Sequence, residues 1–402
     1  MMKRISAIVF ATFCAYVGYK FTLHQSFVNP YPVVCDMVAE KIYLDDKDIL
    51  PWKRTCLSRS HLVTPFSPKK LILKDINNVL DILNVSHLEV FDSSEVKTIW
   101  KGESLETGIE SEFVDSELVI FKVHKDSPAE KLGIKMGDVI KTINGEQPNP
   151  WEAQSQSGAF ILERKGQALN LNLKAADIKR TEKLELQKLS TKHAQIKIPS
   201  FRAEFFKGPE WSEIQKELSK TERLVVDVRG NIGGNFVAGL RFLSFILCDP
   251  QEVGRLIHPR AKTGHIEELP NELSDDKQLA VLDRSREVIL KTFPPAECYK
   301  GKIEVLVDGK TSSVAEMVAQ ALKEFKKARL LGAPSKGQLL VGVWYPLDEV
   351  GPGVEISIPE ALYLSHGNHR IEGNGVQLDK VLYYHLPEMQ AGVDSWVKQA
   401  LD

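Results

Sequence analysis

Apolar residues recur along the chain with two spacings, and each predicts a different kind of element. Residues 71–83 carry Leu, Ile and Val at the spacing of an amphipathic helix. Two short runs, 224–228 and 303–307, are almost wholly apolar, as in buried strands. Helices are expected after them at 236–247 and 313–326. A further helix is expected at 211–220, and strands at 87–91, 118–123, 139–143, 160–163, 169–173 and 194–198. Strand, glycine turn and helix in succession indicate an α/β core.

Three stretches lack a clear period. Residues 26–60 are proline-rich and are expected to be irregular, apart from a short helical stretch near Cys35. Residues 180–189 are polar and charged and are expected to form a connector. Residues 249–300 form a polar, proline-containing insertion, in which only 277–291 are expected to be helical.

The amino-terminal end combines two basic residues with an apolar run. Lys3 and Arg4 precede residues 5–19, which are almost wholly apolar. Such a segment is typical of a secretory signal or a short membrane anchor. No small-x-small cleavage site follows, which favours an uncleaved anchor over a cleaved signal; a buried helix is a further alternative. With the basic pair on the cytoplasmic side, the body of the chain is expected to be exported and periplasmic or otherwise extracytoplasmic.

Composition narrows the possible classes of function. The 402 residues are 43% hydrophobic and 26% charged, as in globular proteins. A chain of this length is expected to form two to four domains. The 52 basic and 54 acidic residues give a formal net charge of −2 without a basic block, so nothing in the charge favours nucleic-acid binding.

Four cysteines lie beyond the apolar run: Cys35, Cys56, Cys248 and Cys298. In an exported body they can form two disulfides, and the sequential pairs are the simplest of three connectivities. Four free thiols are the alternative, because buried cysteine is common. No cysteine or histidine cluster has zinc spacing, so we expect neither a metal nor an organic cofactor.

One block of the sequence resembles a PDZ domain. It contains Ser-Pro-Ala at 127–129, Gly-Asp at 137–138 and Asn-Gly at 144–145. Upstream, Thr107, Gly108 and Ile109 resemble the loop that holds a peptide's C-terminal carboxylate in that family. A glycine lets backbone N–H groups converge on an anion, although a glycine turn without a ligand is the alternative. The resemblance implies a PDZ domain at residues 101–176.

The C-terminal part of the chain resembles the S41 peptidases, the family of C-terminal processing (tail-specific) proteases and tricorn-like core proteases. Four segments match its motifs in order: 227–234 (D-x-R-x-N-x-G-G), 311–316 (S-A-S-A-S-E), 332–337 (G-E-P-T-x-G) and 371–379 (E-x-x-G-V-x-P-D, with Leu378 in place of proline). The resemblance implies an α/β fold with a crotonase- or ClpP-like protease core, a PDZ domain inserted in it or preceding it, and a small N-terminal helical region.

The same resemblance makes Ser313 the nucleophile, three residues before Glu316. A serine at the start of a helix gains from the positive helix end, although a plain capping serine is the alternative. The backbone N–H groups of Gly233, Gly234 and Val314 are expected to form the oxyanion hole. Asp227 and Arg229, in the first motif, are expected to belong to the scaffold.

The base that activates the serine has two candidates. The tail-specific branch of the family uses a lysine, but the gap-free register from Ser313 puts Gln338 at that position and Lys336 two residues early. Lys336 is therefore kept as the alternative base.

The tricorn-like branch uses the histidine of a Ser-His pair, which Ser86 and His87 resemble, together with a glutamate that Glu372 matches. A histidine titrates near neutrality, and a carboxylate can fix its tautomer. We prefer Ser313 with His87, supported by Ser86 and Glu372. A satisfied histidine at a strand edge and a turn carboxylate are the alternatives for His87 and Glu372.

Four parts follow from these motifs: an anchor or signal at 1–25, an N-terminal helical region at 26–100 that contributes to the protease domain, the PDZ domain at 101–176 and the S41 core at 177–402. The expected function is an exported, membrane-tethered serine endopeptidase that cleaves unfolded or C-terminal polypeptide segments through an acyl-enzyme. The PDZ domain would recognise peptide C-termini or gate the site. A catalytically weak peptide-binding relative and acyl-CoA chemistry on the related crotonase-like fold are the alternatives.

Overall fold

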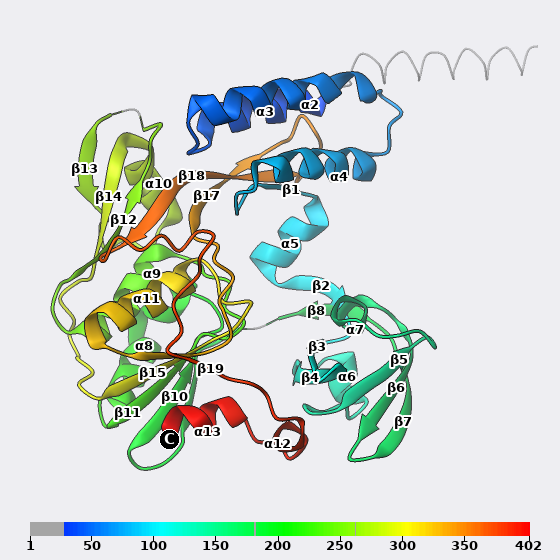
Figure 1. The fold of residues 1–402 in the computed structure, drawn as a ribbon, viewed down its shortest axis with the longest axis vertical. Coiled ribbons are helices and arrows are strands. Elements are labelled where there is room, and N and C mark those ends of the chain that lie inside the picture. Colours follow the sequence, from blue (N-terminus) through cyan, green and yellow to red (C-terminus); the bar gives the residue numbers. More distant parts are fainter. Residues whose placement is uncertain (1–27, 181, 262) are drawn as a thin grey trace, which may run out of the picture. The chain divides into compact units, whose positions relative to one another are not determined.

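The computed structural model describes residues 28–180, 182–261 and 263–402, in two compact units (Figure 1). The first unit comprises the described residues up to Val96 together with Gly342–Glu360, and the second comprises those within Lys97–Val341 and Ala361–Asp402. The predicted domain boundaries at 25, 100 and 176 stay predictions. The apolar run at 5–19 lies outside the described residues, and within them no helix is long and apolar enough to cross a membrane.

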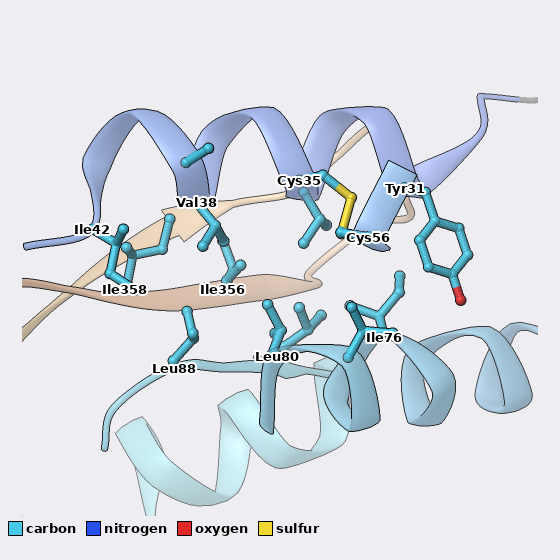
Figure 2. Close-up of a cluster of buried hydrophobic side chains, with 14 of the residues drawn as sticks. Tyr31, Cys35, Val38, Ile42, Cys56, Ile76, Leu80, Leu88, Ile356 and Ile358 are labelled. Atoms are coloured by element: carbon cyan, nitrogen blue, oxygen red, sulfur yellow. A yellow bond between two sulfur atoms is a disulfide. The ribbon is translucent and has the colours of Figure 1, made fainter. Parts of the chain in front are cut away.

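The first unit packs helices against a few strands. Its elements are α2 (Pro30–Lys41), α3 (Asp46–Ser58), η1 (Arg59–Leu62), α4 (Lys69–Leu80), η2 (Asp81–Leu83), β1 (Glu89–Phe91), the start of α5 (Ser93–Lys101), and parts of β17 (Leu340–Pro346) and β18 (Glu355–Ser365). Figure 2 shows Val38, Ile76 and Leu80 of the helices meeting Ile356 of β18 in one buried cluster. The helix expected at 71–83 is therefore confirmed as α4 and the short turn η2, with its apolar face buried.

The expectation of an irregular segment at 26–60 was wrong, because α2 and α3 fill most of it. Asn29 starts α2 by accepting the Tyr31 N–H at 3.1 Å, and proline at the first helical position costs no hydrogen bond. Burial of one face of each helix in the cluster outweighs the weak local preference.

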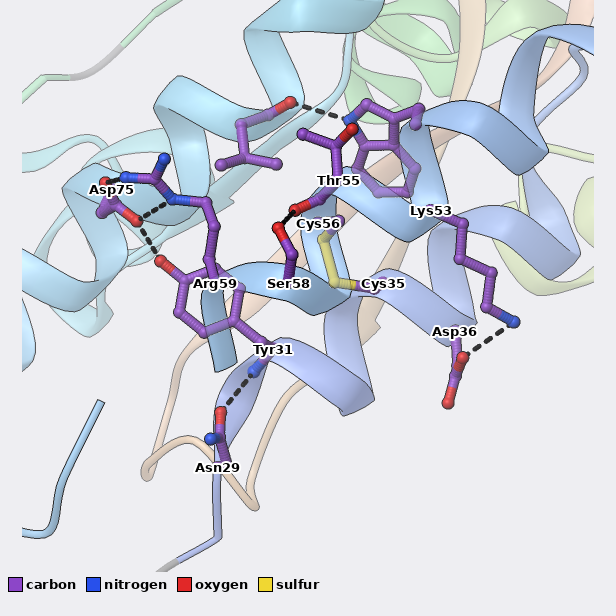
Figure 3. The surroundings of a disulfide bond; sticks show 12 residues. Asn29, Tyr31, Cys35, Asp36, Lys53, Thr55, Cys56, Ser58, Arg59 and Asp75 are labelled. Atoms are coloured by element: carbon purple, nitrogen blue, oxygen red, sulfur yellow. Dashed lines mark hydrogen bonds and ion pairs between the residues drawn. A yellow bond between two sulfur atoms is a disulfide. The ribbon is translucent and has the colours of Figure 1, made fainter. Parts of the chain in front are cut away.

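A disulfide joins α2 and α3 through Cys35 and Cys56, with 5.9 Å between the Cα atoms (Figure 3). Nearby, the Tyr31 hydroxyl and the Arg59 guanidinium both donate to the Asp75 carboxylate, which ties these helices to α4. Burial and the contact with Asp75 raise the pKa of Tyr31 to about 12, so the phenol stays a neutral donor.

A small β domain lies in the second unit. Its five antiparallel strands are, in sheet order, β3 (Ile109–Val114), β4 (Glu117–Val123), β5 (Val139–Ile143), β6 (Gly158–Arg164) and β7 (Gln167–Leu173). The short helices α6 (Pro128–Lys131) and α7 (Pro150–Ser155) accompany them, and β2 (Glu103–Glu106) pairs with β8 (Ala176–Lys179) where the chain enters and leaves. The predicted strands and the Ser127 cap, which accepts the Glu130 N–H at 3.1 Å, are confirmed.

The core sheet has the order β19-β16-β15-β11-β10-β9 and is parallel except at β9. Its strands are β9 (Glu185–Lys188), β10 (His193–Lys197), β11 (Arg223–Asp227), β15 (Lys302–Val307), β16 (Arg329–Gly332) and β19 (Lys380–Val381). Figure 1 shows α9 (Phe236–Leu247) and α11 (Val314–Lys326) on one side of it and α13 (Ser395–Leu401) on the other. The remaining helical elements are η3 (Ala203–Phe206), α8 (Gly208–Leu218) and α12 (Leu386–Gln390). The predicted α/β alternation is confirmed.

The insertion at 249–300 contains more strand than expected. It holds β12 (Glu252–Ile257), β13 (His265–Glu268), α10 (Asp275–Arg284) and β14 (Ser285–Lys291). The helix expected at 277–291 therefore ends at Arg284, because the residues after it pair with β12 and alternate between buried and half-buried positions. Likewise, the connector expected at 180–189 includes β9. Cys248 and Cys298 form the second disulfide, so both cysteine pairs are the sequential ones.

Candidate active site

Two loops meet at the carboxyl ends of neighbouring parallel strands. Strands β11 and β15 pair in register, and the loops that leave them carry residues 228–235 and 308–313. The Asp308 carboxylate accepts the Gly230 N–H at 3.0 Å, and the Thr311 hydroxyl donates to the Val228 carbonyl at 2.9 Å. Side chains of the 308–313 loop thus bind the backbone of the 228–235 loop. Both loops lie at the edge of a parallel sheet where α/β proteins place their sites.

Ser313 is the last residue of its loop and directly precedes helix α11, and its backbone is strained. It has φ 58° and ψ −129°, a conformation that non-glycine residues rarely adopt. Its N–H donates to the Gln338 carbonyl at 2.9 Å and to the Glu316 carboxylate at 3.0 Å. A Cβ atom at Gly233 would lie 2.6 Å from the Ser313 Cβ, so only glycine leaves room for the serine there.

The expected oxyanion donors differ in availability. The Gly233 N–H donates to the Asn231 side-chain oxygen at 2.8 Å, so it is engaged within the loop. Within the described chain, the N–H groups of Gly234 and Val314 donate to no protein acceptor. These two groups are therefore better suited than Gly233 to bind an oxyanion, and Gly233 instead makes room for the nucleophile.

Glu372 lies in a loop that contacts the segment after β16. Its buried carboxylate accepts the Leu339 N–H at 2.9 Å, and the next residue, Gly373, donates to the Gly337 carbonyl at 2.9 Å. Gln338 lies between Gly337 and Leu339, and its carbonyl accepts the Ser313 N–H. The Glu372 loop and the nucleophile therefore both contact the short segment 337–339 of the second unit.

The segment 336–338 bears on the choice between the two candidate bases for the serine. Gln338 contacts Ser313 through its backbone, at the position where the tail-specific branch has lysine. The Lys336 side chain is exposed, whereas a lysine that acts as a base near neutral pH needs a desolvated site. This setting disfavours Lys336 as the base.

The Ser86-His87 pair belongs to the first unit. The Ser86 hydroxyl lies 2.8 Å from His87 Nδ1. His87 also has a positive φ of 59°, and a Cβ atom at Gly342 would lie 3.0 Å from the His87 Cβ. Ser313 and Glu372 belong to the second unit, so their pairing with His87 stays a prediction.

The loop predicted to hold a peptide carboxylate is largely engaged with its own domain. Thr107 is fully buried, its N–H donates to the Gln154 carbonyl at 2.7 Å, and its hydroxyl donates to the Ala153 carbonyl at 2.6 Å. The Ile109 N–H donates to the Thr107 hydroxyl at 3.2 Å. A role in peptide binding stays a prediction that depends mainly on Gly108.

The scaffold interpretation of Asp227 and Arg229 is confirmed. The two side chains form a paired ion contact, and Arg229 also donates to Asp394, which caps α13. Burial alone would raise the pKa of Asp227, but the charge and hydrogen bonds of Arg229 outweigh it and lower that pKa. The pair therefore fastens the C-terminal helix to the sheet.

Comparison with known proteins identifies the class. Residues 192–382 match the sequence model of peptidase family S41, and this stretch contains Gly233, Ser313, Lys336 and Glu372. Over this stretch the chain is similar to the serine-type peptidases of this family.

The relatives include proteases of the C-terminal processing type. The chain is 25% identical over 355 residues to the carboxy-terminal-processing protease of Bartonella bacilliformis, covering 84% of this chain and 75% of that protein. It is 23% identical over 324 residues to a CtpA-like serine protease of Staphylococcus haemolyticus, covering 77% of this chain and 60% of that protein. The chain thus spans between 60% and 75% of the length of these two relatives.

A solved structure shows the same fold. The photosystem II D1 C-terminal processing protease superposes on this chain with a TM-score of 0.54 at 17% identity, covering 88% of this chain and 92% of the other. The expectation of a mixed α/β S41 protease fold is confirmed.

Proposed function

We propose that this chain is an exported serine endopeptidase of the C-terminal processing type, which cleaves polypeptides through an acyl-enzyme at Ser313. The observation that carries the proposal is the strained Ser313 at the amino end of α11, packed against a glycine at which any side chain would clash with the serine. The protease relatives do not favour a chain that only binds peptides.

The proposed chemistry begins with attack of the Ser313 hydroxyl on a substrate carbonyl. His87 Nε2 takes the serine proton, while Nδ1 faces the Ser86 hydroxyl and Glu372 supports the imidazolium. The N–H groups of Gly234 and Val314 stabilise the tetrahedral oxyanion. The protonated histidine then gives its proton to the leaving amine, and water releases the acyl group by the reverse sequence. We prefer His87 over Lys336 as the base, because the Lys336 side chain is exposed.

The small β domain is proposed to act as a PDZ domain that recognises unfolded or C-terminal segments or gates the site. Its edge strand β3 follows Gly108 and offers backbone groups to a peptide strand. This role is tested by comparing the KM of matched substrates that end in a carboxylate or in an amide. We expect a lower KM for the carboxylate, and equal values would contradict carboxylate recognition.

Export and tethering are proposed from the apolar run at 5–19, and the two disulfides support an oxidising compartment. Non-reducing mass spectrometry of protein from its native compartment is expected to detect at least one of the two disulfides. Four free thiols there would contradict export.

The nucleophile is tested by cleavage mapping of an unfolded test protein by mass spectrometry. We expect peptides from the wild type and none from Ser313→Ala, with a melting temperature changed by only a few degrees, because a half-buried hydroxyl adds little stability. Ser312→Ala is the matched control, and its effect is expected to be mild. If Ser312 proved essential and Ser313 dispensable, the assignment of the nucleophile would be wrong.

A further inference from the structure

The carboxylate of Glu316 is buried beside the nucleophile without a counter-ion. Its side chain is fully buried, and none of the lysine, arginine or histidine residues in the described ranges forms an ion pair with it. Burial raises the pKa of Glu316 above its ordinary value, although its hydrogen bonds favour the ionised form. A buried carboxylate is costly unless several donors satisfy it, so its partners point to its role.

Four donors converge on this carboxylate. They are the N–H of Ser313 at 3.0 Å, the hydroxyl of Ser335 at 2.7 Å, the N–H of Gly337 at 2.8 Å and the N–H of Gln338 at 3.0 Å. The contact with Ser313 is the usual one for a glutamate at the third position of a helix. The other three donors come from a segment about twenty residues further along the chain, which helix capping alone does not require.

The same segment carries contacts of both proposed catalytic residues in the second unit. The Gln338 carbonyl accepts the Ser313 N–H at 2.9 Å, and the Leu339 N–H donates to Glu372 at 2.9 Å. Glu316 therefore connects the backbone of the nucleophile with the segment that contacts Glu372.

We propose that Glu316 is a positioning residue of the peptidase site, which holds Ser313 in its strained backbone conformation and holds residues 335–339 in place against it. The inference rests on the proposed function at Ser313. Because the Glu316 carboxylate is fully buried, it acts through Ser313 and not on the substrate. Loss of its charge is therefore expected to lower kcat and to leave KM nearly unchanged.

The test variant is Glu316→Gln, which keeps the shape but turns an acceptor into a donor that faces N–H groups. A displaced nucleophile can lose about 100-fold in rate, so we expect kcat to fall by about that factor. KM is expected to stay within about threefold. The second-order rate of Ser313 labelling by a fluorophosphonate is expected to fall with kcat.

Glu324→Gln is the matched control on the same helix. The Glu324 carboxylate also accepts bonds from a distant loop, from the Ser365 hydroxyl at 2.7 Å and the Gly367 N–H at 3.2 Å, but it contacts neither Ser313 nor residues 335–339. We expect both Glu324→Gln and Glu316→Gln to lower the melting temperature, but Glu324→Gln to leave kcat within about twofold. Equal losses of kcat in the two variants would reduce Glu316 to a general structural role and overturn the inference.

Ser335→Ala keeps the inference testable if Glu316→Gln fails to fold. It removes one of the four donors and leaves the carboxylate, so we expect kcat to fall by about three- to tenfold at an unchanged KM. Wild-type kcat in Ser335→Ala would overturn the inference while leaving the proposed function intact. A wild type whose Ser313 neither reacts with the fluorophosphonate nor cleaves the test protein would instead overturn the proposed function, and the inference with it.

Discussion

The Ser313 and His87 regions lie in different compact units and are held in different ways. Both residues have an unusual positive φ, 58° and 59°. Hydrogen bonds to Glu316 and Gln338 hold the backbone of Ser313, whereas the residues after His87 are fixed by apolar burial, with Leu88 and Val90 in the core of the first unit. Substitutions beside Ser313 are thus expected to cost more activity than substitutions beside His87.

An added methyl group is expected to have the largest effect. In Gly233→Ala the new Cβ would lie 2.6 Å from the Ser313 Cβ, on a backbone with φ 103°, and we expect kcat/KM to fall by about 1,000-fold. In Gly342→Ala the first contact is the Ser357 hydroxyl at 2.7 Å, a side chain that can rotate away. A loss of about tenfold is expected there, measured on the same peptide. A harmless Gly233→Ala would show that Ser313 is not held as described.

The disulfides come next, measured by denaturant unfolding. The loop-closure relation gives about 3 kcal/mol for Cys35–Cys56 and about 4 kcal/mol for Cys248–Cys298, whose sequence separations are 21 and 50. We expect the double alanine variant at Cys248 and Cys298 to lose more stability than the one at Cys35 and Cys56. Unchanged unfolding of both variants would mean that the cysteines do not pair.

Buried polar groups provide the third contrast. Asn231 accepts the Gly233 N–H and donates to the Ile198 carbonyl, both at 2.8 Å, so Asn231→Ala leaves two buried groups unsatisfied and should cost about 2 kcal/mol. The Ser357 hydroxyl is buried and has no partner among the described residues. Ser357→Ala is expected to be neutral or slightly stabilising. A larger loss at Ser357 than at Asn231 in thermal unfolding would reverse the proposed contrast.

The smallest effect is expected at Asp75, which is partly exposed. Hydrogen bonds from Arg59 lower the pKa of Asp75. A lowered folded pKa gives stability that is present above the ordinary value of about 3.9 and is lost as the pH falls through the folded value. Asp75→Asn should therefore cost less than about 1 kcal/mol at pH 7, and this cost should shrink as the pH falls through the folded pKa of Asp75. A difference that grew on acidification would contradict this sign.

The fold could be predicted from the sequence where the local spacing of apolar residues reveals which residues are buried. The apolar runs at 224–228 and 303–307 and the helix at 236–247 were recognised because each element buries a continuous stretch or face. Helix α3 and strand β14 were missed, because α3 contains Pro51 and β14 follows a helix without a turn signal. Only packing against distant residues decides their structure.

The site could be predicted in part. The order of the motifs singled out Ser313 and the glycines beside it. Glycine is visible in the sequence, and it is required where the backbone approaches Ser313 closely. The contacts of Glu316 with residues 335–338 and of Asn231 with Ile198 were missed, because these partners lie on other segments of the fold. The S-x-x-E spacing before an apolar helix was the available signal for Glu316, but it predicts only a cap.

The central claim, that His87 activates Ser313, is tested most directly by the pH dependence of kcat/KM in the wild type, His87→Ala and Lys336→Ala. We expect the wild-type profile to rise with an apparent pKa within about one unit of 6.5, as for a histidine. Lys336→Ala should keep this profile and much of the activity, whereas His87→Ala should lose several orders of magnitude. An active His87→Ala enzyme, with a wild-type rise nearer pH 7–8 that Lys336→Ala abolishes, would contradict the claim.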